Sequence, residues 1–334
     1  MAIAASGAVS FSDLRTEFVG GSAAISYSDL YRGGSNIRAK AANNTGVNLA
    51  ASVPTSGTIN ISNFRSQAKG FRFTYTSGAT NQSAATLFGD DYAVNYRKEI
   101  VIDSGVELGA TSTSEEALEI PSGGSGTIVV TNNGFLSGAG GAAGAAGGDA
   151  FEAAVACTLI NNGTIRAGGG GGGTGGNGYY SYTSYGPQYF SAAGDNVYYV
   201  RCSSSSFRTV YANVSVTRSN CGPFFSPNLA RRNFVYTSGV FAYYRISTYS
   251  SSTAYTNGGA GGVGQGYNQS STSGSAGGTN AGSGGSGANF GSTGSTGVNG
   301  NSTNGSAGGA AGNYIRGLSF VTLTQSGTVQ GGTA

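Results

Sequence analysis

The sequence predicts a mainly β fold combined with glycine-rich helices of the polyglycine II type. Three observations predict it: short alternating apolar runs bounded by turn residues, glycine at every third position of several segments, and 61 glycines among 334 residues. The usual share of glycine is about 7%. A period of three residues fits neither an α-helix nor a strand, but it matches the three residues per turn of the polyproline II conformation.

Three segments carry most of this glycine, and we call them the glycine segments: 138–149, 168–178 and 258–312. Glycine at every third position leaves one edge of such a helix bare, so another backbone can approach it closely. A flexible Gly/Ser linker is the alternative. Ordered packing predicts that Gly144→Val or Gly294→Val lowers the melting temperature, because the branched side chain would block a neighbouring helix.

Residues 1–70 contain a repeat with copies at 6–15, 22–31 and, more loosely, 56–65. Each copy begins with an alternating apolar pair, which predicts a short strand. A Ser followed three residues later by Asp, as at Ser10 and Ser26, is typical of a helix start. We therefore expect short strand-plus-helical-turn repeats.

Such a repeat unit cannot bury its apolar face alone, so its copies must pack on one another or on a partner. This favours an N-terminal docking module over a small independent domain. The residues predicted to dock are Phe11, Leu14, Tyr27 and Leu30.

Residues 71–134 predict a β domain with strands at 71–75, 99–103 and 126–131. For Asp90 and Asp91 a solvated surface is favoured over metal or acid–base chemistry, because they lack the spacing of a metal site. They belong to a larger group of acidic residues in this segment. These residues are Asp90, Asp91, Asp103, Glu107, Glu115, Glu116 and Glu119.

A second repeat relates 129–138 to 158–167 and, more weakly, to 323–331. Asn-Gly between short apolar runs predicts a tight turn, since both residues accept positive φ. The glycine segments therefore begin and end on strands, and 318–324 is the predicted closing strand. Residues 135–334 are predicted to form a glycine-rich distal domain that carries the insert 179–256.

The insert holds thirteen of the twenty tyrosines, and its six arginines face a single acid, Asp195. Tyr with Ser and Asn is typical of recognition loops, and Arg binds phosphate or carboxylate in bidentate fashion. We therefore predict binding of an anionic glycan, a glycolipid or an outer-membrane protein loop; an ordinary β domain with Tyr-lined strands is the alternative. The candidate binding residues are Tyr182, Tyr185, Tyr189, Arg201, Arg208, Arg231, Arg232, Tyr243 and Tyr244.

Composition argues against several other functions. The chain has no His, which is the commonest general base and metal ligand, and its three Cys lack the spacing of a zinc site. We expect no metal, no cofactor and, with a net charge of +3 and no Lys in the insert, no nucleic-acid partner. Cys202 and Cys221 could be bridged or free. No signal peptide and no stretch of 18 apolar residues is seen.

The phrases at 7–17 and 28–34, with the Asn-Asn-Gly turns that lead into glycine, resemble tail-fibre or receptor-recognition proteins of tailed bacteriophages. The glycine segments are similar in kind to the distal adhesins of T-even long tail fibres, which carry a polyglycine II sandwich whose loops bind the host surface. The resemblance implies a virion tail protein made in the host cytoplasm. It also implies docking of the N-terminus to other tail or baseplate proteins, and recognition of a bacterial surface glycan, lipopolysaccharide or outer-membrane protein by the C-terminal half.

The favoured function is thus a phage adhesin without enzymatic activity. A purely structural fibre protein is the main alternative. A polysaccharide-degrading tailspike needs paired carboxylates, and the insert offers only Asp195. A homotrimer, common among phage fibres, and a bundle closed within one chain both remain open.

Overall fold

The computed structural model describes residues 3–20, 24–34, 36–185, 191–192, 197–201, 207–211, 229–238 and 241–334. The chain divides into two compact units, one of Met1–Gly178 with Asn257–Ala334 and one of Tyr179–Thr256. Strands dominate both units, so the predicted mainly β class is confirmed. No described helix is long and apolar enough to cross a membrane.

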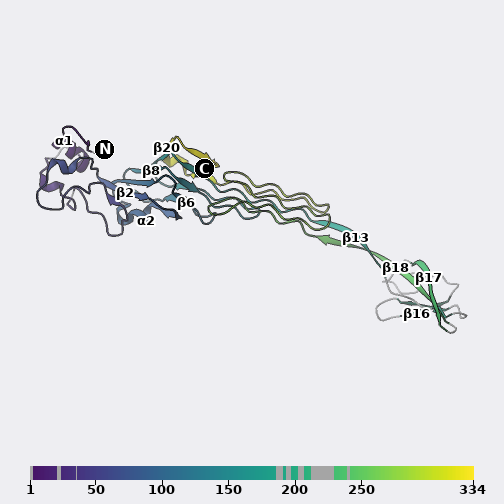
Figure 1. The fold of residues 1–334 in the computed structure, drawn as a ribbon. Coiled ribbons are helices and arrows are strands. Elements are labelled where there is room, and N and C mark those ends of the chain that lie inside the picture. Colours follow the sequence, from purple (N-terminus) through teal and green to yellow (C-terminus); the bar gives the residue numbers. More distant parts are fainter. Residues whose placement is uncertain are drawn as a thin grey trace. The chain divides into compact units, whose positions relative to one another are not determined.

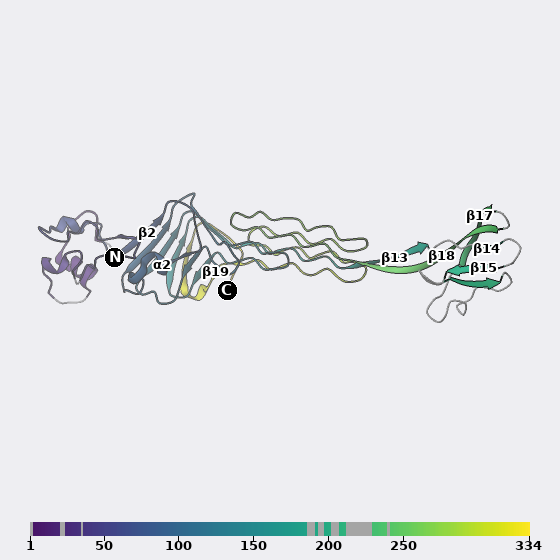
Figure 2. The ribbon, with the colours of Figure 1, turned by 90° about the horizontal axis from the view of Figure 1, so that it is seen from below.

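The larger unit is built on a three-sided coil of parallel strands (Figures 1 and 2). Each turn of the coil gives one strand to each of three sheets, and equivalent strands of successive turns pair in parallel. The first turn consists of β2 (Gly70–Tyr75), β3 (Ala79–Thr80) and β4 (Gln82–Ser83), and the second of β5 (Arg97–Ile102), β6 (Glu107–Gly109) and β7 (Leu118–Ile120). The third consists of β8 (Ile128–Asn132), β9 (Phe135–Ser137) and β10 (Phe151–Ala153), and the fourth of β11 (Cys157–Asn161), β12 (Thr164–Arg166) and β19 (Asn313–Arg316). The fifth consists of β20 (Val321–Gln325), β21 (Thr328–Gln330) and β22 (Gly332–Thr333).

The core of the coil forms because parallel pairing in register keeps the same side of every turn facing inward. Ile100, Val130 and Leu159 stand opposite one another on neighbouring strands and are all fully buried. Strands β8 and β11 alternate buried and half-buried residues along their length, as the two-residue period of a strand requires. Each such buried side chain contributes roughly 1.5–3 kcal/mol through the hydrophobic effect.

The two Asn-Asn-Gly turns carry the chain round a corner, from the first sheet to the second. The positive φ expected at these turns is wrong: neither Asn-Gly pair adopts it. Glycine is needed there for close stacking, because a Cβ on Gly163 would lie 2.1 Å from the carbonyl oxygen of Gly134. The buried Asn132 and Asn161 stack as well, and the Nδ2 of Asn132 donates to the Oδ1 of Asn161 at 2.8 Å.

The glycine segments all leave the coil between its second and third sheets. The first lies between β9 and β10, and the other two lie between β12 and β19. Apart from Gly178, which begins β13 (Gly178–Tyr185), they run alongside one another without helix or strand (Figure 1). Their backbones are hydrogen-bonded to one another at three-residue intervals: the N–H groups of Gly169, Gly172 and Gly175 donate to the carbonyls of Gln265, Gly262 and Gly259, each at 2.8 Å.

Segment 168–176 lies at the centre of these contacts. Its N–H groups donate in three directions, and its carbonyls accept from three further segments. The neighbours to which it donates are 145–148, 259–265 and 292–298, and those from which it accepts are 141–144, 282–288 and 306–312. All six neighbours belong to the same chain.

The N-terminal part of the larger unit contains the three sequence copies as three short helical turns. They are α1 (Phe11–Leu14), which continues into η1 (Arg15–Val19), η2 (Tyr27–Leu30) and η3 (Ile61–Phe64). Each begins with a reciprocal cap, formed by Ser10 with Asp13, Ser26 with Asp29 and Asn60 with Asn63, so the predicted helix starts are present. The hydrogen bonds from Ser10 and Ser26 lower the pKa of Asp13 and Asp29.

The short strands predicted before these turns are wrong, since 8–10, 24–26 and 58–60 form no strand. The second member of each apolar pair is already the first residue of the helical turn, so the two-residue period stops where the turn begins. These turns share a core of their own, separate from that of the coil: Ile3, Leu14, Phe18, Leu30, Ile37, Ala50, Val53 and Phe64.

A short antiparallel strand, β1 (Val47–Asn48), joins this N-terminal part to β2. Between β4 and β5 lie α2 (Ala84–Phe88) and η4 (Gly89–Asp91), and η6 (Leu318–Phe320) precedes β20. The smaller unit is a sheet with the order β13-β18-β14-β15-β16, in which β17 pairs with β18. Its strands are β13 (Gly178–Tyr185), β14 (Ser191–Ala192), β15 (Val197–Arg201), β16 (Phe207–Tyr211), β17 (Leu229–Ser238) and β18 (Phe241–Thr256).

Candidate functional site

The candidate binding residues of the insert stand on strands. Tyr182 and Tyr185 belong to β13, Arg201 ends β15, Arg208 lies on β16, Arg231 and Arg232 on β17, and Tyr243 and Tyr244 on β18. Pairing of β17 with β18 places Tyr236 opposite Tyr243 and Phe234 opposite Tyr244. Tyr189, Cys202 and Cys221 lie outside the described residues. The register thus brings the arginine pair and the tyrosine pair onto adjacent strands.

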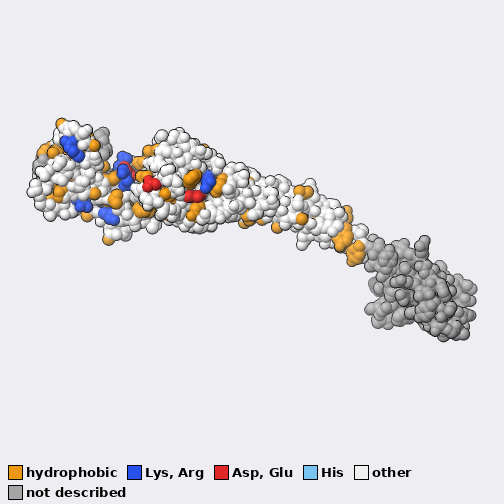
Figure 3. All heavy atoms as spheres, in the orientation of Figure 1, with side chains coloured by type: hydrophobic (Ala, Val, Ile, Leu, Met, Phe, Trp, Pro, Cys, Tyr) orange, Lys and Arg blue, Asp and Glu red, His pale blue; other side chains and the backbone are white. Residues whose placement is uncertain are grey.

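Three exposed tyrosines near the ends of the insert escaped the sequence prediction. Tyr179 and Tyr180 of β13 are 43% and 37% exposed, and Tyr255 of β18 is 78% exposed, beside the predicted Tyr182 at 47%. Hydrophobic side chains gather where the described chain gives way to the residues drawn in grey (Figure 3). The consecutive tyrosines Tyr179 and Tyr180 at the start of the insert could have indicated this site. Their exposure, however, cannot be predicted from the sequence.

The N-terminal docking residues divide between surface and core. Phe11 is 43% exposed, whereas Leu14 and Leu30 are fully buried among the apolar side chains of their own module. The prediction that these two leucines contact a partner is therefore corrected: they hold the three helical turns together. The side chain of Tyr27 lies outside the described part of the chain.

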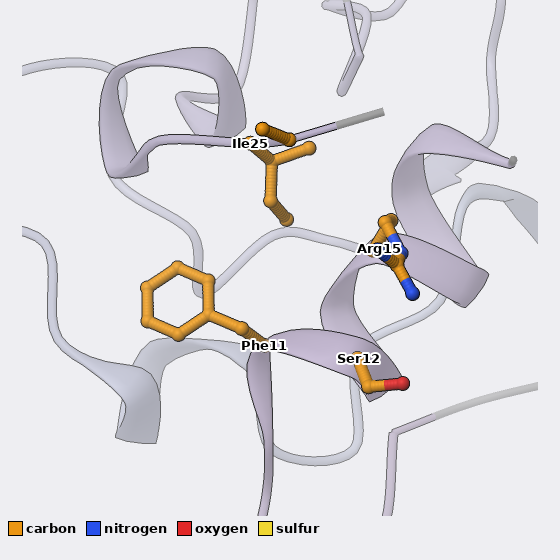
Figure 4. Close-up of a pocket in the computed structure, with 5 residues that line it drawn as sticks. Phe11, Ser12, Arg15 and Ile25 are labelled. Atoms are coloured by element: carbon orange, nitrogen blue, oxygen red, sulfur yellow. The ribbon is translucent and has the colours of Figure 1, made fainter. Parts of the chain in front are cut away.

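A hollow of about 230 Å³ lies between the first two repeats. Phe11, Ser12 and Arg15 line it from the first repeat, and Ala24 and Ile25 line it from the second. Phe11 and Ile25 lie on opposite sides of the same space (Figure 4). An aromatic and an aliphatic side chain thus border an open depression of mixed polarity on this module, to which Ser12 and Arg15 also contribute.

The repeats contact one another in cyclic order. The hydroxyl of Tyr31, which follows the second turn, donates to the carbonyl of Gly57 at the start of the third copy. Arg65, which follows the third turn, donates from Nη2 to the carbonyl of Gly7 at the start of the first copy, at 2.8 Å. Equivalent positions thus make equivalent contacts, and the third copy closes back onto the first.

Several of the acidic residues between Asp90 and Glu119 form ion pairs, which the sequence did not indicate. Asp91 is fully buried, 3.1 Å from the Nε of Arg38, and Glu107 pairs with Arg166 at 2.8 Å. The predicted solvated surface is therefore wrong for Asp91, whereas Asp90 is exposed as expected. Glu116 is also buried. The described residues hold no group of three His, Cys, Asp or Glu side chains arranged to bind a metal.

Arg316 of β19 is the cation of the largest ion-pair group. Its Nη2 donates to Glu116 at 2.5 Å and to Glu152, and its Nε lies 3.7 Å from Asp149. Burial raises the pKa of Glu116 to about 7, even though Arg316 acts in the opposite direction. Burial also raises the pKa of Glu119, which pairs across the sheet with Glu152. One arginine therefore faces several carboxylates where the long glycine segment rejoins the coil.

Comparison with known proteins gives one family. Residues 58–197 match the sequence model of the family described as phage tail fibre adhesin Gp38. No curated protein matches the chain. A solved structure, the crystal structure of the gp37-gp38 adhesin tip complex of the bacteriophage S16 long tail fiber, aligns with 84% of this chain over 88% of its own, at 16% identity and a TM-score of 0.40.

The family match covers most of the three-sided coil, the first two glycine segments and the start of the insert, and it begins after the first two N-terminal repeats. The resemblance of this chain to the tail-fibre adhesins of tailed bacteriophages, as its sequence predicts, is therefore confirmed, and it rests on residues 58–197.

Proposed function

We propose that this protein is a phage adhesin that is carried in the virion tail and binds the surface of the bacterial host. The match of residues 58–197 to phage tail fibre adhesins is the observation that carries this proposal. The proposed ligand is a surface glycan, lipopolysaccharide or outer-membrane protein, and the proposed action is binding without catalysis. The six arginines of the insert, set against one acid, support contact with an anionic part of that surface.

We also propose that the glycine segments form a bundle of polyglycine II helices. The three-residue spacing of their hydrogen bonds supports this, since a helix with three residues per turn directs successive N–H groups toward three neighbours in rotation. The six neighbours of 168–176 take up its hydrogen bonds within one chain, so this segment needs no second chain to satisfy them. The bundle would hold both ends of the insert, because the N–H of Gly258 donates to the Oδ1 of Asn177 at 3.1 Å.

For residues 1–70 we propose docking to another protein of the phage tail. The cyclic contacts through Tyr31 and Arg65 support a module with three related surfaces. The hollow beside Phe11 would be one of them. Such a module suits a partner that presents three equivalent chains, such as the end of a homotrimeric fibre.

Phe11→Asp should remove the protein from virions without unfolding it. The ring is 43% exposed, so the folded chain tolerates the charge, whereas a docked partner would lose its contact with the ring and would have to desolvate a carboxylate. Virions purified from cells that express the variant, probed for the adhesin, make the measurement. Phe320→Asp, at a ring that is 46% exposed outside the module, is the control. Normal incorporation of the Phe11 variant would contradict docking at this hollow.

Removal of the insert should separate assembly from adsorption. A chain in which Gly178 is joined to Asn257 through an Asn-Gly turn keeps the larger unit intact, because the insert is a compact unit of its own. We expect virions that contain this chain and no longer adsorb to host cells. Unchanged adsorption would instead establish the structural-fibre alternative. Steady release of reducing sugar from host envelope by the full chain would point to the tailspike.

A further inference from the structure

The two strands that begin and end the insert carry exposed aromatic rings on both faces. Successive side chains of a strand point to opposite faces, so Tyr180 and Tyr182 share one face of β13 and Tyr179 lies on the other. The ring centroids of Tyr180 and Tyr182 are 6.2 Å apart at an interplanar angle of 48°. Across the ribbon, the rings of Tyr179 and Tyr255 are 6.5 Å apart at 58°. We call these four residues the tyrosine ribbon.

Pairing of β13 with β18 uses the backbone of the ribbon, and the exposed parts of the four rings are accessible to a ligand. Neither 178–185 nor 252–256 contains a charged residue. Exposed Ser181 and Thr253 stand next to the tyrosines and add further hydroxyl groups to this surface. The tilted rings do not cover one another's faces.

These features match the chemistry of a neutral sugar. A pyranose ring has an apolar face of C–H groups that lies flat on an aromatic ring, and hydroxyls at its edge that pair with Tyr, Ser and Thr hydroxyls. A phosphorylated or acidic sugar would gain nothing from a surface without cations. We propose that the tyrosine ribbon binds neutral sugar units of the host surface glycan, whereas the arginines of the insert are proposed above for its anionic groups. This inference rests on the proposed adhesin function.

The test uses the labelled full-length protein and intact cells of the bacterium that the phage infects. Two double variants, Tyr179→Ser with Tyr255→Ser and Tyr180→Ser with Tyr182→Ser, each remove the rings of one face. We expect each to weaken binding to cells about tenfold or more, as loss of anchor residues does. Phe320→Ser removes an equally exposed ring elsewhere and should bind as the unaltered protein does. Circular dichroism confirms that the variants are folded.

Competition identifies the ligand. Polysaccharide released from the same cells is separated into neutral and anionic fractions, and outer-membrane proteins are prepared in vesicles. The neutral fraction should displace the unaltered protein from the cells. The ribbon variants keep some binding, and displacing it should require at least tenfold more of the neutral fraction. Ribbon variants that bind as well as the unaltered protein, or displacement by the anionic fraction or the vesicles alone, would overturn the inference and leave the adhesin function standing. No binding of the unaltered protein to the cells would refute the adhesin function itself.

Discussion

Replacing Gly294 by Ala is expected to destabilise the protein by about 3 kcal/mol or more, near the upper end of single substitutions. The added Cβ would lie 2.1 Å from the carbonyl oxygen of Gly171. That oxygen cannot move aside cheaply, because it accepts from the N–H of Gly309 at 2.7 Å, and Gly309 in turn accepts from the N–H of Gly294 at 2.9 Å. Thermal unfolding followed by circular dichroism measures the effect.

Gly144 supplies the control for this experiment and corrects the sequence prediction. It lies in the same triplet pattern, but a Cβ there would meet nothing within 4 Å. Its φ of +73° places it in a turn, where Asn is tolerated. Gly144→Asn should therefore leave the melting temperature almost unchanged. Equal melting of the Gly294 variant and the unaltered protein would show that the glycine segments behave as a linker.

The protein should be more stable at pH 5 than at pH 7.5, with Glu116 as the main cause. Burial raises the pKa of this carboxyl from 4.5 to about 7. Between pH 4.5 and pH 7, Glu116 is therefore protonated in the folded state and ionised in the unfolded state. The contribution of this protonation to the free energy of unfolding is complete below pH 4.5 and disappears as the pH rises through 7. A shift of this size corresponds to roughly 3 kcal/mol as an upper bound.

Glu116→Gln should remove most of this pH dependence, because Gln is neutral throughout and can still accept from Arg316. Part of the change in stability with pH should remain, since the pKa of Glu119 is also raised. Glu115→Gln, at an exposed neighbour, is the matched control. The range from pH 5 to 7.5 stays below the lowered pKa of Lys98, about 8. A Glu116→Gln variant whose melting temperature varies with pH as before would contradict this assignment.

Local patterns in the sequence determined the mainly β class, the positions of β2, β5, β8 and β11, the helix caps at Ser10 and Ser26 and the three-residue period of the glycine segments. Each of these depends on residues close together in the chain: alternation sets a strand, and a Ser three residues before an Asp sets a cap. The family resemblance came from similarly short phrases.

Only the tertiary structure decided which side of these elements faces inward. Leu14 and Phe11 occupy the same helical turn, yet one is core and the other surface. Gly144 and Gly294 share one sequence pattern, yet only at Gly294 would an added Cβ meet another backbone. The parallel coil, the stacking at Gly163 and the burial of Glu116 all arise between residues far apart in the chain. Burial and close approach depend on which distant segments become neighbours, and no local periodicity specifies that.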